Sequence, residues 1–152
     1  MTLLIVYALL SIGISFMCSV LEAALLSVTP TYIKIKTKEG KSYAKTLTKF
    51  KQDIDKPLIA ILSLNTIAHT VGAILVGVQA EKTFGNGNNA VGIVSTIMTI
   101  LILVLSEIIP KTIGAKYWKN LGNFTAKILT FILIPLRYTG ILWVLMLFTK
   151  LI

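Results

Sequence analysis

Three apolar stretches of membrane-spanning length constrain this chain more than any other feature. Polar segments separate them, and each approaches or exceeds the roughly 20 apolar residues that a helix needs to cross a bilayer. Only 14% of the residues are charged, against about 25% in soluble domains. We therefore predict an all-α membrane protein. Residues 1–152 would form one transmembrane domain, with spans at about 3–29, 57–80 and 90–116.

The polar linker between the first two spans, at about 30–56, carries eight of the fifteen basic residues against three acids. Cytoplasmic loops are enriched in Lys and Arg, so we place the linker in the cytoplasm and the amino terminus outside, in a plasma-membrane protein. Scattered apolar side chains indicate one or two short amphipathic helices on the membrane surface, broken at Gly40. The segment that follows the second span, 81–89, contains a turn-rich run at 84–89 and then lies outside.

The carboxyl-terminal segment, at about 120–152, is apolar enough to suggest a fourth span, but Pro135 and Arg137 interrupt it. An arginine is costly at membrane depth. We therefore favour a pair of juxtamembrane amphipathic helices along the inner surface, with the carboxyl terminus in the cytoplasm and lysines at lipid head groups. Contact with cytoplasmic lipid head groups also explains the net charge of +9 better than nucleic-acid binding does, because no nucleic-acid-binding motif is present.

A carboxylate ends the third apolar stretch, in the sequence Ser106-Glu107-Ile108-Ile109-Pro110-Lys111-Thr112. An ionisable group inside a membrane costs at least about 2.5–3.5 kcal/mol, so it persists where it faces a polar cavity or a cation. Pro110 has no backbone N–H and disturbs the turn around Glu107, which frees carbonyl oxygens. Carboxylate and carbonyl oxygens at membrane depth are suited to a hard cation.

Polar residues of the other two spans lie at a similar depth. At 1.5 Å per residue, Glu22 and Ser19 lie about 9 and 14 Å from the inner end of their helix, and Asn65 lies about 12 Å from the inner end of its own. Glu107 lies about 10–15 Å from the inner end of the third helix. An all-oxygen set favours Mg²⁺, Ca²⁺ or Na⁺ over zinc or copper. We interpret the single His69 as a hydrogen-bonded core residue.

Each of these residues also has a simpler interpretation. Ser19 could bond its own helix or aid packing, and Asn65 could join two helices. Glu22 could pair with a linker lysine, and Glu107 with Lys111 four residues on, although Lys111 also has the length to reach the head groups. The shared depth favours a common cation site over these separate roles.

The sequence contains no enzyme signature. A nucleophile elbow, a His-Glu-x-x-His pair and a phosphate loop are all missing, so we expect no catalytic activity. Polar residues on the outer half favour an ion pathway over a non-transporting scaffold; they are Ser11, Ser15, Thr70, Gln79, Ser95, Thr96 and Thr99.

Three motifs resemble the transmembrane domain of the CorC / cyclin M (CNNM) magnesium transporters. They are the stretch Phe16–Leu25, the Leu64-Asn65-Thr66 triplet, and Ser106–Thr112, which is similar to the family's Gly-Glu-Ile-x-Pro-Lys-Thr. The resemblance implies a homodimer that exports Mg²⁺ by alternating access, coupled to Na⁺ entry. It also implies cytoplasmic CBS domains, which this sequence does not include. The alternative is a non-transporting Mg²⁺ sensor or scaffold, with the dimer locked by the cation.

The resemblance also implies a ligand set for a largely dehydrated Mg²⁺. Side chains of Ser19, Asn65 and Glu107 would bind the ion. Carbonyls near Ala23 and around Ile113 or Gly114 would complete the shell, and Glu22 would be a supporting or Na⁺-related acid.

Overall fold

The computed structural model describes residues 1–85 and 89–138, and every regular element within them is helical. The elements are α1 (Thr2–Ser27), α2 (Pro30–Lys38), α3 (Ser42–Gln52), α4 (Asp55–Phe84), α5 (Ala90–Leu101), the π-helix η1 (Ile102–Ile108) and α6 (Ile109–Tyr138). The all-α prediction is confirmed.

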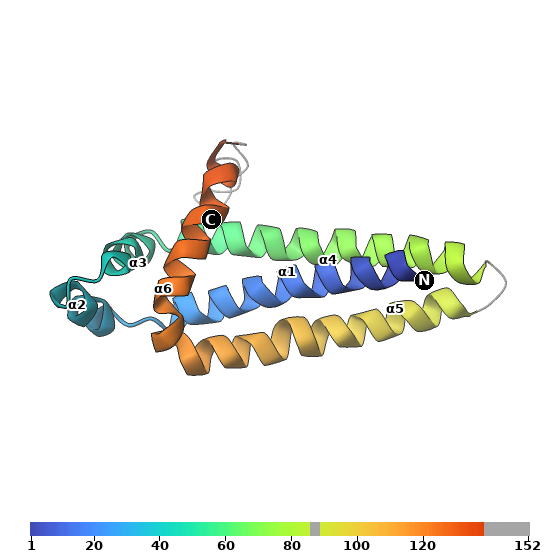
Figure 1. Cartoon of the computed structure of the whole chain (residues 1–152), viewed down its shortest axis with the longest axis horizontal. Helices are drawn as coiled ribbons and strands as arrows, with labels where there is room; N and C mark the ends of the chain where they lie inside the picture. Colours follow the sequence, from blue (N-terminus) through green and yellow to red (C-terminus); the bar gives the residue numbers. More distant parts are fainter. Residues whose placement is uncertain (86–88, 139–152) are drawn as a thin grey trace, which may run out of the picture.

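Three long helices lie side by side along the molecule (Figure 1): α1, α4, and a third helix made of α5, η1 and the first part of α6. All three are long and apolar enough to cross a membrane, so the prediction of three helices of membrane-spanning length is confirmed. Helix α1 packs against both of the others. Apolar side chains cover the outward surfaces, as a lipid-facing bundle requires; examples are Leu9, Ile74, Ile93 and Ile100.

Local signals explain where the short helices begin and end. The side chain of Thr29 caps α2 by accepting a hydrogen bond from the backbone nitrogen of Tyr32 at 3.3 Å, and Pro30 occupies the first turn. Gly40 takes a φ of +72°, which separates α2 from α3 as expected. Helix α4 runs past the predicted end of the second span and stops at Gly85, whose φ is +77°. The prediction that the second span ends at residue 80 is therefore four residues short.

The third helix is irregular at two points. Around Glu107 the backbone forms η1, so the disturbance before Pro110 is a π-helical stretch and the helix continues through the proline. At Tyr117, with φ −106° and ψ 17°, α6 bends. Its remainder runs across one end of the bundle (Figure 1). This part of α6 therefore runs in a different direction from the three long helices. The carboxyl-terminal segment was predicted to form a pair of helices, and its residues 139–152 lie outside the described residues.

The main core lies where α6 crosses α1 and α4. Leu21 and Leu25 from α1, Ile61 from α4 and Leu129 from α6 are fully buried there, and Cys18 belongs to the same cluster. Cys18 is therefore a small core residue, as expected. This packing fixes the part of α6 beyond its bend against the end of the bundle.

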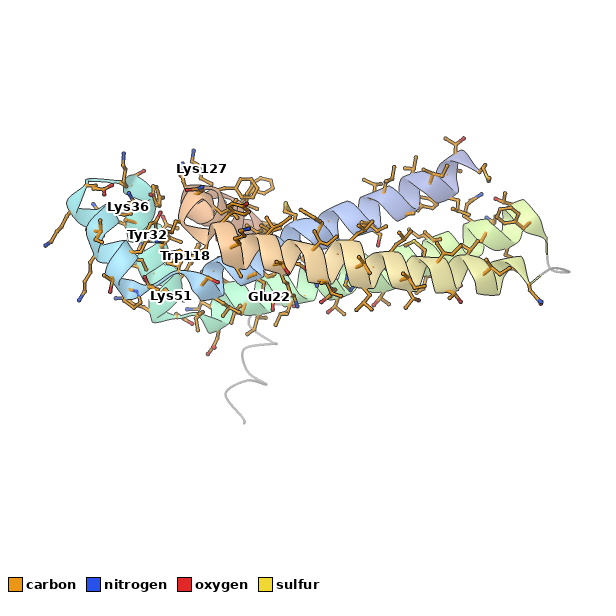
Figure 2. All side chains as sticks on the ribbon, turned by 90° about the horizontal axis from the view of Figure 1, so that it is seen from below. Glu22, Tyr32, Lys36, Lys51, Trp118 and Lys127 are labelled. Atoms are coloured by element: carbon orange, nitrogen blue, oxygen red, sulfur yellow. The ribbon has the colours of Figure 1, made fainter. Side chains whose placement is uncertain are left out.

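Helices α2 and α3 attach to the bend of α6 through aromatic residues. The Tyr32 hydroxyl donates to the Lys119 carbonyl at 2.7 Å, and its ring meets Trp118 edge to face with 5.0 Å between centroids. Figure 2 shows Tyr32 and Trp118 at this junction. Burial, followed by the hydrogen bond to Tyr43, raises the pKa of the Tyr32 hydroxyl above its usual range. The lysine-rich linker is thus held to the end of the bundle.

Candidate cation site

Helices α1 and α6 approach each other closely at Gly114. A Cβ atom at this position would lie 2.5 Å from the Val20 carbonyl oxygen, 2.9 Å from Ala23 Cβ and 3.2 Å from the Ala24 nitrogen. Only glycine fits there without moving a backbone. The two backbone segments that the resemblance assigns to the ion, near Ala23 and Gly114, are therefore neighbours.

Two carboxylates share one lysine just beside this crossing. Lys111 Nζ lies 3.1 Å from Glu107 Oε2 and 3.6 Å from Glu22 Oε2. The expected pair between Glu107 and Lys111 is present, whereas Glu22 pairs with Lys111 and not with a linker lysine. Figure 2 shows Glu22 within the bundle and Lys51 of the linker at its end. Of the two interpretations of Lys111, the structure shows the ion pair, and the carboxylate of Glu22 on α1 adds a second partner.

A second polar group links Glu107 to α4. Ser15 Oγ donates to Asn65 Oδ1 at 2.7 Å and also lies within hydrogen-bond distance of His69 Nε2. His69 Nδ1 is 3.8 Å from Glu107 Oε1. Asn65 thus joins two helices, one of its simpler interpretations, and His69 is hydrogen-bonded as expected. From the sequence we placed Ser15 in the outer pathway and missed its role in this polar group. Its spacing of four residues from Ser19 was the available signal, because residues four apart share one helix face.

Three buried oxygens near these residues have no hydrogen-bond partner: Ser19 Oγ, Glu22 Oε2 and Ser106 Oγ. Ser19 is fully buried, and its hydroxyl does not bond its own helix, so that interpretation is wrong. Leaving a buried polar atom unpaired costs about 1–3 kcal/mol. Such atoms mark places where a ligand would stabilise the protein.

The donor chemistry of this layer suits hard cations. Within residues 1–85 and 89–138, no group of three His, Cys, Asp or Glu side chains is placed to hold a metal ion. A bound cation would rely on carboxylate, amide, hydroxyl and carbonyl oxygens, which Mg²⁺, Ca²⁺ and Na⁺ accept. Pro110 has no N–H with which to donate to the Ser106 carbonyl, as an α-helical residue would.

The expected outer pathway is only partly internal. Ser11 and Ser15 are buried between α1 and α4, and Ser11 Oγ donates to the Ala68 carbonyl at 2.8 Å. The hydroxyls of Thr96 and Thr99 instead donate to carbonyls of their own helix and lie on its exposed side. Thr70 and Ser95 are exposed as well.

Three long apolar helices around a layer of half-buried carboxylates and buried amide and hydroxyl groups define a polytopic membrane protein with a polar site inside its helical bundle. More specifically, the chain belongs to the cyclin M (CNNM) family, since the family's Cyclin M transmembrane N-terminal domain matches residues 5–152. The family resemblance inferred from the motifs is confirmed.

Relatives in three bacteria are described as UPF0053 proteins. The one from Synechocystis is 35% identical over 125 residues, which cover 80% of this chain and 36% of the relative. The one from Haemophilus influenzae is 28% identical over 129 residues, 85% of this chain and 30% of the relative. The one from Mycoplasma genitalium is 30% identical over 118 residues, 75% and 28% of the two chains. This chain thus spans about a third of the relatives that it matches.

Proposed function

We propose that this chain is the ion-conducting membrane domain of a Mg²⁺ transporter. The observation that carries the proposal is the buried Ser19 Oγ, which has no hydrogen-bond partner, together with Glu22 Oε2, which makes no hydrogen bond and faces Lys111 Nζ at 3.6 Å. Helical spacing places both residues at the depth of Asn65 and Glu107. Membership of the cyclin M family supports Mg²⁺ among the hard cations that such a layer suits. The ion is cargo, so its ligands must hold it strongly enough for entry and weakly enough for release.

In this proposal Ser19, Asn65 and Glu107 bind the ion through side-chain oxygens. Backbone carbonyls near Ala23 and Gly114 complete a near-octahedral shell, which Mg²⁺ requires. The close crossing of α1 and α6 supports a joint contribution from these two backbones. Glu22 acts as a supporting acid that also attracts Na⁺.

Transport runs from the cytoplasm to the outside and is driven by Na⁺ entry, by alternating access. Two contacts in the outer half of the bundle would have to part for release. Ser11 is bonded to Ala68, and Gly72 packs so closely on Ser11 that a Cβ there would lie 2.1 Å from its hydroxyl. The lysine-rich α2 and α3 support a cytoplasmic location for this end of the bundle in the plasma membrane, with the amino terminus outside.

The proposed assembly is a homodimer in contact with lipids. Within Val91–Leu101 of α5, Met98 is the buried side chain, and the exposed side carries Gly92, Ser95 and Thr99. Small and hydroxylated residues of this kind favour close helix–helix contact in membranes. The bent part of α6 would lie along the inner surface, as a juxtamembrane helix.

Ion flux across sealed liposomes tests the proposal. We expect Mg²⁺ efflux from vesicles to follow an imposed inward Na⁺ gradient, and Glu107→Gln to abolish both flux and tight Mg²⁺ binding. Asp53→Asn is the matched control, since Asp53 pairs with Lys56 at 2.5 Å in the linker, away from the bundle. Unchanged Mg²⁺ affinity in Glu107→Gln would exclude Glu107 as a ligand.

A second candidate is a membrane Mg²⁺ sensor or scaffold whose dimer is locked by the cation. The exposed positions of Thr70, Ser95, Thr96 and Thr99 favour it, because these hydroxyls do not line a pathway inside one chain. Mg²⁺ binding that depends on Glu107 but is accompanied by no flux, in a full-length relative as well as in this chain, would support the sensor.

A further inference from the structure

Lys111 is the cation that the structure places on the two site carboxylates. Its ammonium nitrogen lies between Glu107 Oε2, at 3.1 Å, and Glu22 Oε2, at 3.6 Å. The three groups carry a net charge of −1, and they connect η1 and the start of α6 to the carboxyl-terminal part of α1. One lysine therefore partly neutralises the carboxylates that the proposed function assigns to the transported ion.

A divalent ion cannot share this position with the lysine at low cost. Mg²⁺ binds carboxylate oxygens at about 2.0–2.1 Å. An ammonium 3.1 Å from the same Glu107 oxygen would then lie within about 5 Å of a double positive charge, where repulsion is strong in a partly dry site. With the lysine removed, the two carboxylates carry −2, which one divalent cation neutralises.

The lysine has the means to leave. Its side chain is 42% exposed, so the carboxylates hold its head group while one side of the chain remains uncovered. A flexible four-carbon stem allows a lysine to move its head group by several ångströms toward the membrane interface without moving its helix. The fully buried Ser19, in contrast, cannot move away from the site.

From this geometry we propose that Lys111 is a tethered competitor of the transported ion: Lys111 and a divalent cation occupy the Glu22–Glu107 pair alternately. The inference rests on the proposed function and adds a residue that sets the affinity of the site. The lysine holds α1 and α6 together when the ion is away and lowers the affinity of the ion, which favours release. It acts by competing for ligands and does not bind the ion itself.

Mg²⁺ titration calorimetry of the detergent-solubilised chain tests this role through Lys111→Gln. If the lysine holds the carboxylates about nine-tenths of the time, its removal tightens Mg²⁺ binding about tenfold. Lys116→Gln is the matched control. It removes the same charge from the same helix, but Lys116 lies over the Tyr117 ring, 5.6 Å from its centroid. Unchanged or weaker binding in a folded Lys111→Gln, beside a wild type that binds Mg²⁺, would overturn the proposal.

A second measurement needs no substitution at Lys111. Brief acetylation of the wild-type chain, read by mass spectrometry, should modify Lys111 severalfold faster with Mg²⁺ than without, while Lys116 stays constant. In Glu107→Gln the Mg²⁺ effect should vanish. Equal labelling of Lys111 under saturating Mg²⁺ would refute the alternation even if Lys111→Gln fails to fold. A wild type that binds no Mg²⁺ at all would instead remove the proposed function, and this inference with it.

Discussion

The serines at positions 15 and 19 lie one helical turn apart and are both fully buried, yet their hydroxyls are used differently. Ser15 Oγ bonds Asn65 and contacts His69, whereas Ser19 Oγ has no partner. A buried hydroxyl without a partner destabilises the fold, and a bonded one stabilises it. This difference separates a residue that joins helices from one that is available to a ligand.

Alanine substitutions at these two serines should therefore have opposite effects. Ser19→Ala should leave the thermal unfolding temperature unchanged or slightly higher and weaken Mg²⁺ binding at least about tenfold, as loss of a metal-site group does. Ser15→Ala should lower stability by about 1 kcal/mol, because it removes hydrogen bonds between α1 and α4. Thermal melts and Mg²⁺ titrations of both variants provide the check. A large loss of stability in Ser19→Ala would mean that its hydroxyl serves the fold.

At the scale of elements, the crossing of α1 and α6 depends on a single missing methyl group. Gly114 faces the Val20 carbonyl so closely that an added Cβ would displace one backbone or the other. Gly13 in α1, in contrast, has no atom within 4 Å of its added Cβ. Gly114 is therefore in close contact with a neighbouring backbone, whereas Gly13 has open space around it.

We expect Gly114→Ala to lower the free energy of unfolding by about 1–3 kcal/mol, the usual cost of overpacking. Mg²⁺ binding should weaken as well, because the carbonyls near Ala23 and Gly114 would separate. Gly13→Ala should raise stability by about 0.5–1 kcal/mol, since alanine is the better helix former. Thermal unfolding in detergent measures both changes, and equal stability of the two variants would contradict the tight crossing.

Element boundaries were predictable where the chain carries a strong local signal. Gly40 correctly marked the break before α3, and Thr29-Pro30 is the local signal at the start of α2. The bend at Tyr117 has no such signal, because neither proline nor glycine stands there. Packing of the following segment against Leu21, Leu25 and Ile61 holds α6 across the bundle, and that interaction is formed only in the folded chain.

For the whole molecule, the distribution of lysines predicts the orientation in the membrane. Helices α2 and α3 lie at one end of the bundle, and the end of α4 and the start of α5 lie at the other (Figure 1). Single cysteines in place of the exposed Lys45 and Lys82 mark these two ends. Cys18, fully buried, should react with neither side.

In intact cells, a membrane-impermeant maleimide should label Lys82→Cys and leave Lys45→Cys unlabelled; inside-out vesicles should reverse the pattern. The physical reason is that a loop with many lysines is retained in the cytoplasm during insertion. Labelling of Lys45→Cys from outside would reverse the proposed orientation and with it the cytoplasmic entry of Mg²⁺.

The sequence by itself determined the class of this protein, the number of spans and the family. Length and hydropathy are sufficient for the class and the number of spans, since few backbone structures can cross a bilayer. The family follows from the motif around Glu107, which is specific. Helical spacing also predicted that Ser19, Asn65 and Glu107 share one depth. Only the tertiary structure decided that Lys111 turns inward to Glu22, that Ser15 joins Asn65, and that α6 bends across the bundle. Each of these depends on which side chain faces another across two helices, and such contacts are specified by packing and charge between segments far apart in the chain.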